Sequence, residues 1–312
     1  MRRKALILLR WIKMLRGKSV FHINQSEGRL YLKGEIRGYY SDLRHKVTGD
    51  IIIDDFMKVP VNVSDNGNKI YFPIAIFQYG LGAFDLYLET GDKSFLDKFI
   101  NSVKWALDNQ CEDGSWDNFG WVFPSARYSS MAQAEGASLL CRAYSEWRDK
   151  RYLNAAQLAI DFMLVPVEDG GTTSYTDSGG VTFEERAGRR TILNGMIFSI
   201  WGLYDLTLLI GDDRYTDILA RSINHLCILL PDYDRGYWSD YDLDGNIASK
   251  FYHKLHIEQL KTLSNLFGKE AFNEYISRWE CYTKSFINPK RAFIIKAIQK
   301  IRVIDSEVTI IK

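Results

Sequence analysis

The chain has 312 residues, of which 46% are hydrophobic and 25% charged, and it contains six prolines. These proportions are typical of a folded globular protein and exclude disordered, collagen-like and disulfide-scaffold proteins. The net charge is only +1, but residues 1–18 and 282–304 contain no acidic residue and carry +7 and +6, which leaves −12 on the body between them. An acidic body is poorly suited to nucleic acid, so we expect no nucleic-acid partner.

The N-terminal segment 1–18 begins like a secretory signal, but Arg10, Lys13 and Arg16 interrupt its apolar run. We therefore expect a cytoplasmic protein. Apolar side chains between these basic residues predict an amphipathic segment in peripheral contact with a membrane. Residues 288–312 repeat the pattern and are expected to form a basic C-terminal tail.

The four cysteines lack the spacing of a zinc site. Cys141 and Cys227 lie in apolar helical stretches, which favours buried thiols in a reducing compartment.

Residues 19–70 contain short segments in which apolar and polar side chains alternate, interrupted by the turn signal Ser64-Asp-Asn-Gly67. We expect a small β-rich or extended N-terminal segment that is too small to fold alone.

From residue 71 the hydrophobic period becomes helical, and a unit of about 60 residues recurs. Turns at Asp92, Asp149, Asp212 and Gly268 are 57, 63 and 56 residues apart, each between two helical stretches. The repeat predicts a mainly α protein, with an open (α/α) toroid of about four helical hairpins over residues 71–287. The long loops that follow each second helix should lie at one end, where their aromatic residues and carboxylates could line a polymer groove.

Two metal-binding patterns are incomplete. The segment Asp240-Tyr-Asp-Leu-Asp-Gly245 matches the start of a Ca²⁺ loop, but Ala248 and Phe251 stand at the later ligand positions. His253 and His256 are three residues apart with no indicated third ligand. We expect no metal and interpret the histidines as part of a polar groove wall.

A loop between two repeats combines Glu184 and Glu185 with Arg186, Arg189 and Arg190. It is either a surface loop of mixed charge or a set of acid and base groups beside guanidinium groups that suit carboxylates. The nucleophile elbow, the phosphate loop and the dinucleotide fingerprint are absent from the sequence, which argues against the common hydrolase, kinase and Rossmann classes.

Several linked motifs over residues 70–283 resemble, in order, the D-glucuronyl C5-epimerases of heparan sulfate and heparosan. They are Tyr71-Phe-Pro-Ile-Ala-Ile-Phe-Gln-Tyr-Gly-Leu81, Met131-Ala-Gln133, Leu193-Asn-Gly-Met-Ile-Phe-Ser-Ile-Trp-Gly-Leu-Tyr-Asp-Leu206, Trp238-Ser-Asp-Tyr-Asp-Leu243 and Phe251-Tyr-His-Lys-Leu-His-Ile-Glu-Gln-Leu260. The resemblance implies a helical (α/α) domain that interconverts glucuronate and iduronate units in a polysaccharide, without a cofactor.

The resemblance also implies the residues of a site. Glu185, Tyr241 and Tyr252 match catalytic positions: we expect Glu185 and Tyr252 to transfer protons and Tyr241 to position the substrate or relay a proton. Arg186, where the family commonly has tyrosine, is expected to neutralise the substrate carboxylate. The expected substrate-binding residues are Tyr71, Gln78, Tyr79, Arg186, Arg189, Arg190, Asn194, Trp238, His253 and His256. The family's N-terminal region supplies functional tyrosines, for which Tyr39, Tyr40 and Tyr71 are the candidates.

Two other functions stay open at this point. A uronate polysaccharide lyase shares the (α/α) architecture and the first proton abstraction, and then expels the 4-O substituent. A glycan-binding protein of a polysaccharide assembly system would keep the aromatic rim without the acid and base groups. In each case the partner is a glucuronate-containing polysaccharide; the residues do not fix the oligomeric state, for which a homodimer is one candidate.

Overall fold

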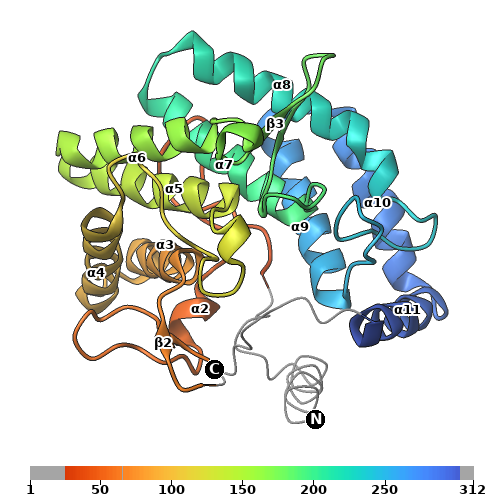
Figure 1. Cartoon of the computed structure of the whole chain (residues 1–312), viewed down its shortest axis with the longest axis horizontal. Helices are drawn as coiled ribbons and strands as arrows, with labels where there is room; N and C mark the ends of the chain where they lie inside the picture. Colours follow the sequence, from red (N-terminus) through yellow and green to blue (C-terminus); the bar gives the residue numbers. More distant parts are fainter. Residues whose placement is uncertain (1–24, 65, 303–312) are drawn as a thin grey trace.

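The computed structural model describes residues 25–64 and 66–302 and is mainly helical (Figure 1). Segment 1–18, expected to be amphipathic, lies outside the described residues. Four helical hairpins follow one another along the chain, as the repeat predicts, and a further helix follows them. Their bounds are α3 (Pro73–Thr90) with α4 (Lys93–Asn109), α5 (Ser130–Trp147) with α6 (Lys150–Met163), α7 (Leu193–Leu209) with α8 (Asp213–Leu229), α9 (Lys250–Phe267) with α10 (Glu270–Lys284), and finally α11 (Asn288–Arg302).

The predicted turns are the tight connections inside the hairpins. Asp92, Asp149 and Asp212 are N-caps whose carboxylates accept a hydrogen bond from the backbone N–H two residues later, at 2.8–2.9 Å. Gly268 ends α9 in the left-handed conformation, with φ of 65°. The sequence therefore places all four turns correctly.

The first helix of each hairpin is an inner helix and the second an outer one, so that the hairpins form an open arc (Figure 1). The inner helices α5 and α7 are buried nearly all round, whereas the outer helices α6 and α8 bury one face. Glycine permits the closest approach between inner helices: a β-carbon on Gly202 of α7 would lie 2.4 Å from the carbonyl oxygen of Ala134 on α5.

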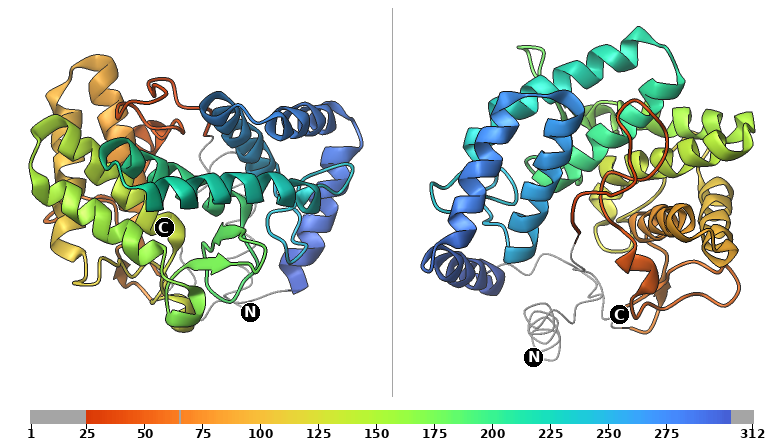
Figure 2. Two further views of the ribbon diagram at one scale, coloured as in Figure 1. Left: turned by 90° about the horizontal axis from the view of Figure 1, so that it is seen from above. Right: turned by 180° about the vertical axis from the view of Figure 1, so that it is seen from behind.

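Residues 25–44 cross the C-terminal halves of the inner helices (Figure 2). The Tyr39 N–H donates to Asp85 of α3 at 2.9 Å, and the Tyr40 hydroxyl donates to Asp205 of α7 at 2.6 Å. Asp205 also forms a fully buried ion pair with Arg142 of α5, at 2.6 Å. Tyr39 and Tyr40, candidates for functional tyrosines, are thus fully buried in the packing at this end of the arc.

The rest of the N-terminal part is extended with little regular structure. It contains α2 (His45–Thr48) and a two-stranded antiparallel sheet of β1 (Asn62–Val63) and β2 (Lys69–Ile70), joined by the expected turn that ends at Gly67. A second antiparallel sheet, β3 (Thr173–Tyr175) and β4 (Val181–Phe183), precedes α7. Three short 3₁₀ turns lie in the return loops, at Pro124–Ala126, Val167–Asp169 and Leu230–Tyr233.

Two further expectations concern the cysteines and the C-terminal segment. Cys141 is buried as expected, but Cys227 is only half-buried, because it lies at the edge of the buried face of α8. Residues 288–302 of the expected basic tail form α11, which packs on α9 and α10. Within the described residues, helices both long and apolar enough to cross a bilayer are absent.

Candidate functional site

The loops before α5, α7 and α9 meet at the N-terminal ends of these helices, as the repeat predicts. The Ser130 N–H donates to the Glu184 carbonyl oxygen at 3.1 Å, and the Leu193 N–H donates to the Tyr241 carbonyl oxygen at 3.1 Å. The Gln259 side chain of α9 donates to a carbonyl oxygen in the first turn of α7 at 3.2 Å. These bonds fix three inner helices and two loops against one another at one end of the arc.

The paired glutamates after β4 have different surroundings. The Glu184 carboxylate is buried and accepts hydrogen bonds from the hydroxyls of Thr182 and Thr191, both at 3.1 Å, so it braces the loop. The Glu185 carboxylate has a different partner: it accepts a hydrogen bond from the side-chain amide of Asn194, in the first turn of α7, at 3.3 Å. Burial raises the pKa of Glu185 to about 7, although Asn194 and the guanidinium of Arg186 oppose the shift. A carboxyl group with this pKa can accept or donate a proton near neutral pH.

Tyr241 lies near this carboxyl group, and Tyr252 lies against Tyr241. Their rings meet edge to face, with centroids 4.7 Å apart and an interplanar angle of 60°. The backbone N–H of Tyr241 donates to the Asn246 carbonyl oxygen, which fixes the position of Tyr241 in the loop. Tyr252 lies in the first turn of α9, where its backbone N–H donates to the side chain of the N-cap residue Ser249. Burial, the nearby charge of Glu185 and a hydrogen bond with Tyr252 together raise the pKa of Tyr241 well above its ordinary value, so its phenol is neutral at physiological pH.

Of the three arginines in the loop before α7, one lies at the site and two contact the loop before α9. The guanidinium carbon of Arg186 lies 4.0 Å from the ring centroid of Phe123, in the loop before α5, and its charge interacts with the site carboxyl and phenol groups. Arg189 faces the Asp244 carboxylate at 3.9 Å, and Arg190 donates to a backbone oxygen of the same loop at 3.0 Å. Arg186 is thus the arginine that the structure brings to the site, whereas Arg189 and Arg190 join two loops.

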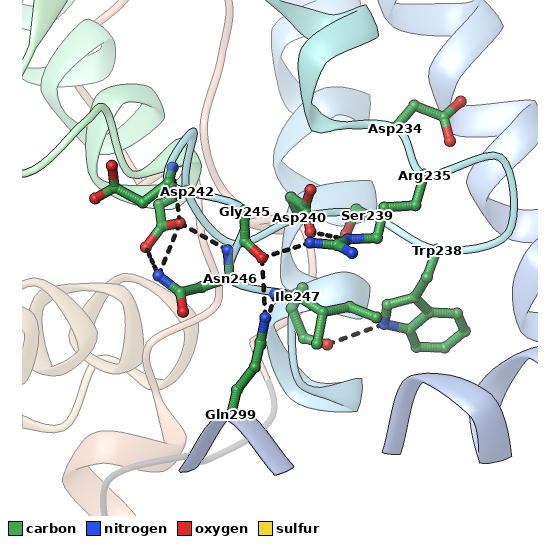
Figure 3. A network of polar contacts seen from close by, with 12 residues as sticks. Asp234, Arg235, Trp238, Ser239, Asp240, Asp242, Gly245, Asn246, Ile247 and Gln299 are labelled. Atoms are coloured by element: carbon green, nitrogen blue, oxygen red, sulfur yellow. Dashed lines mark hydrogen bonds and ion pairs between the residues drawn. The ribbon is translucent and has the colours of Figure 1, made fainter. Parts of the chain in front are cut away.

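The loop that carries Tyr241 is held by a polar network (Figure 3). Asp240 pairs with Arg235, and Asp242 accepts hydrogen bonds from the backbone N–H groups of Asp244 and Asn246 and from the Asn246 side chain. Each carboxylate of the incomplete Ca²⁺ pattern therefore has its own protein partner. Over residues 25–64 and 66–302, groups of three or more side chains arranged to hold a metal ion are absent.

Helix α11 also reaches this loop, which the sequence interpretation did not anticipate. The Gln299 side chain accepts from the Ile247 N–H at 3.0 Å and donates to the Gly245 carbonyl oxygen at 2.9 Å (Figure 3). One turn earlier, the Lys296 ammonium lies 5.4 Å from the ring centroid of Tyr241. Burial lowers the pKa of Lys296 to about 8. The basic sequence of this helix predicts a tail, whereas Ala292, Ile295 and Gln299 on its inner side dock it on the fold.

Three residues expected to contact the substrate are buried: Trp238 in this loop, and His253 and His256 in the first two turns of α9. The Trp238 ring stacks on the His253 ring with centroids 3.7 Å apart, and its N–H donates to the Ala248 carbonyl oxygen. The Ser239 hydroxyl lies 2.8 Å from Nδ1 of His253 and 3.2 Å from Nδ1 of His256. Burial lowers the pKa of His253 to about 4 and holds the pKa of His256 well below its ordinary value. Both histidines are fully buried, and the expected groove wall is absent from these positions because the side chains pack inside the fold. His253 bonds through both ring nitrogens, whereas Nε2 of His256 has no hydrogen-bond partner.

The remaining expected residues come from the first hairpin. Tyr71 precedes α3 and stacks near Trp105, while Tyr79 is buried in α3. Gln78 is also buried, and its amide donates to Glu135 of α5 at 2.9 Å. Glu135, which sequence reasoning missed, is fully buried, and its Oε2 has no hydrogen-bond partner. Burial and the charge of Glu185 raise the pKa of Glu135 well above its ordinary value, so a second acid lies near the site.

Two known proteins have sequences related to part of this chain. A D-glucuronyl C5-epimerase of Caenorhabditis elegans is 29% identical over 213 residues, which are 59% of this chain and 34% of that protein. An uncharacterized protein of Methanocaldococcus jannaschii is 33% identical over 155 residues, which are 48% of this chain and 50% of that protein. The chain therefore spans about a third to a half of the length of these relatives.

A solved structure supports the architecture. Cellobiose 2-epimerase from Bacillus thermoamylovorans superposes with a TM-score of 0.54 over 77% of this chain and 67% of that chain, at 14% sequence identity. At this identity the likeness is one of fold, an (α/α) toroid.

The sequence profile of a known family matches residues 101–281, which are more than half of the chain. The matched range contains Glu185, Tyr241 and Tyr252 and ends before α11. This protein belongs to the D-glucuronyl C5-epimerase C-terminus family.

Proposed function

We propose that this protein inverts C5 of glucuronate and iduronate units in a glycosaminoglycan-like polysaccharide. The observation that carries the proposal is the convergence of Glu185, Tyr241 and Tyr252 at the N-terminal ends of α7 and α9. Family membership supports a C5-epimerase, and the choice of glucuronate units follows from the similarity to the D-glucuronyl C5-epimerase of Caenorhabditis elegans.

The reaction needs a proton acceptor on one face of the sugar ring and a proton donor on the other. In one direction the Glu185 carboxylate takes H5, and the electron pair of the C5–H bond passes into the adjacent carboxylate group as an enolate. The Tyr252 hydroxyl then gives its proton to C5 from the opposite face. This turnover leaves Glu185 protonated and Tyr252 as a phenolate, which is the starting state for the reverse direction.

The surrounding charges suit this assignment. The enolate carries an added negative charge, which the guanidinium of Arg186 would stabilise. A Tyr252 phenolate needs a nearby cation and a proton donor, and the neutral Tyr241 phenol meets its ring edge while the Lys296 ammonium lies over Tyr241. Tyr241 would thus relay the proton that restores Tyr252 after each turnover.

Incubation of the protein with heparosan and other glucuronate polymers in D₂O tests the proposal. Deuterium at C5 together with iduronate signals in the NMR spectrum is the expected result. Unsaturated chain ends would identify a lyase, and polymer binding without deuterium incorporation would identify a glycan-binding protein. Either of these results overturns the proposal.

A further inference from the structure

Helix α11 has apolar side chains on two faces, and the described part of the chain packs against one of them. Its inner face packs Ala292 and Ile295 against Trp238 and Ile247 below the site loop. Its outer face and the turn before it expose apolar side chains whose exposed fractions are unusually high. These are Phe286 (81%), Ile287 (69%), Ile294 (57%), Phe293 (43%) and Ile298 (43%), which we call the α11 apolar face.

Single exposed apolar residues are common on protein surfaces, but five within thirteen residues indicate an interaction surface. Phe286, Ile287 and Ile294 line a hollow together with the basic residues Lys290 and Arg291. The Lys290 ammonium lies 3.4 Å from the ring centroid of Phe286, so charge and apolar surface are directly adjacent. Between residues 282 and 304 the chain carries six basic residues and no acidic one.

The charge decides what can cover this face. A second copy docked face to face across a two-fold axis would bring two acid-free, positively charged surfaces together. The N-terminal segment 1–18 carries +7 without an acid, so it would also meet like charge there. Whatever covers the α11 apolar face must therefore carry negative charge and must also accept the inserted phenylalanine and isoleucine side chains.

We propose that the α11 apolar face docks on an anionic lipid bilayer, with Phe286, Ile287 and Ile294 inserted among the lipids. Lysine and arginine side chains beside them would reach the headgroups while the apolar side chains enter the acyl region. The net charge of −12 between the two basic ends would keep other faces away from the same membrane. Docking would place the opposite side of α11, with Gln299 and the site loop, just above the bilayer. The proposal does not rest on the proposed function, because binding is measured without a polysaccharide.

Co-sedimentation of the full chain with vesicles of phosphatidylcholine, with and without phosphatidylglycerol, tests the proposal. We expect binding only to the anionic vesicles, weakened by salt. Ile287→Ser with Ile294→Ser should weaken binding at least tenfold, and Lys284→Glu with Lys290→Glu should weaken it by about 25-fold or more, given about fivefold for each basic residue near the surface. Phe56→Ser with Ile228→Ser, which changes similarly exposed apolar residues elsewhere, is the matched control and should bind like the wild type.

Several results would overturn the proposal. The full chain could fail to bind anionic vesicles, or the α11 variants could bind as tightly as the wild type and the control. A concentration-dependent dimer in sedimentation velocity that is lost in Ile287→Ser with Ile294→Ser would instead identify a second copy as the occupant. Thermal unfolding of each variant checks that α11 stays folded, and an unchanged melting temperature is expected because the replaced side chains face solvent.

Discussion

Glu185 lies directly over Gly195: a β-carbon on Gly195 would be 2.5 Å from Glu185 Oε2 and 2.6 Å from Glu185 Cβ. The absence of a side chain at Gly195 thus allows the carboxyl group to rest on the first turn of α7. Gly195→Ala should push the Glu185 carboxyl group away. We expect the rate of hydrogen exchange at C5 of the sugar (C5 exchange) to fall by about 10²-fold, because a catalytic group misplaced by about 1 Å loses that much activity. NMR detection of deuterium incorporation at C5 measures this loss.

Gly211→Ala is the matched control for this substitution. Gly211 lies between α7 and α8, its φ is not positive, and an added β-carbon there meets no atom within 4 Å. We expect wild-type exchange for this variant. Equal exchange in Gly195→Ala and Gly211→Ala would show that the position of Glu185 does not matter for the reaction.

Removal of one phenol oxygen separates the chemistry of the tyrosine pair from its packing. Tyr252→Phe and Tyr241→Phe keep the edge-to-face rings, so both variants should fold like the wild type. Each should lose inversion at C5, measured as the conversion of glucuronate to iduronate, by 10²–10⁴-fold, as expected for a lost proton donor or relay. Tyr275→Phe, which changes a buried tyrosine of α10 outside the site, should keep its activity. A wild-type rate of inversion in both site variants would refute the roles given to these phenols.

The raised pKa of Glu185 predicts a pH dependence of stability with a definite sign. Its folded pKa of about 7 lies above its ordinary value of 4.5, so the folded state holds a proton that the unfolded chain has released. The resulting stabilisation is complete below the unfolded pKa and is lost as the pH rises through about 7. Glu185→Gln has no such loss, so its melting temperature relative to the wild type should rise between pH 5 and pH 8. A difference that stays constant over this range would contradict the raised pKa of Glu185.

The contact between α11 and the site loop can be tested at one side chain. Gln299→Ala removes the two hydrogen bonds to Gly245 and Ile247, each of which contributes about 1 kcal/mol. We expect a loss of about 1–3 kcal/mol in the free energy of unfolding and a clear decrease in C5 exchange, because Tyr241 lies in the loop that Gln299 holds. Gln157→Ala removes one side-chain hydrogen bond, from the middle of α6 to the Tyr215 hydroxyl of α8, and should lower stability without lowering the exchange rate of the folded protein. Unchanged exchange in Gln299→Ala would show that α11 does not position Tyr241.

The sequence predicted features that depend on local rules, and the structure differs where tertiary contacts decide. Asp92, Asp149 and Asp212 could be located because an N-cap residue follows a recurrent local pattern. The neighbouring positions of Tyr241 and Tyr252 also followed from the repeat, since both flank the start of α9.

Burial at the site was harder to predict. Trp238 and His253 resemble groove residues in a sequence, but each finds a hydrogen-bond partner inside the fold, which allows it to be buried. Glu135 was missed because nothing in an alanine- and serine-rich helix shows that its glutamate points inward. Lys296 was missed because its partner Tyr241 is 55 positions away along the chain.

The most direct test of the account uses polymers deuterated at C5 of either glucuronate or iduronate, with loss of deuterium to water measured at early times. If Glu185 and Tyr252 act on opposite faces of the ring, Glu185→Gln should lose wash-out from one epimer and keep it from the other. Tyr252→Phe should show the reverse selectivity, while the wild-type protein exchanges both. Equal loss from both epimers in each variant, or full wash-out from both, would contradict two proton-transfer groups on opposite faces.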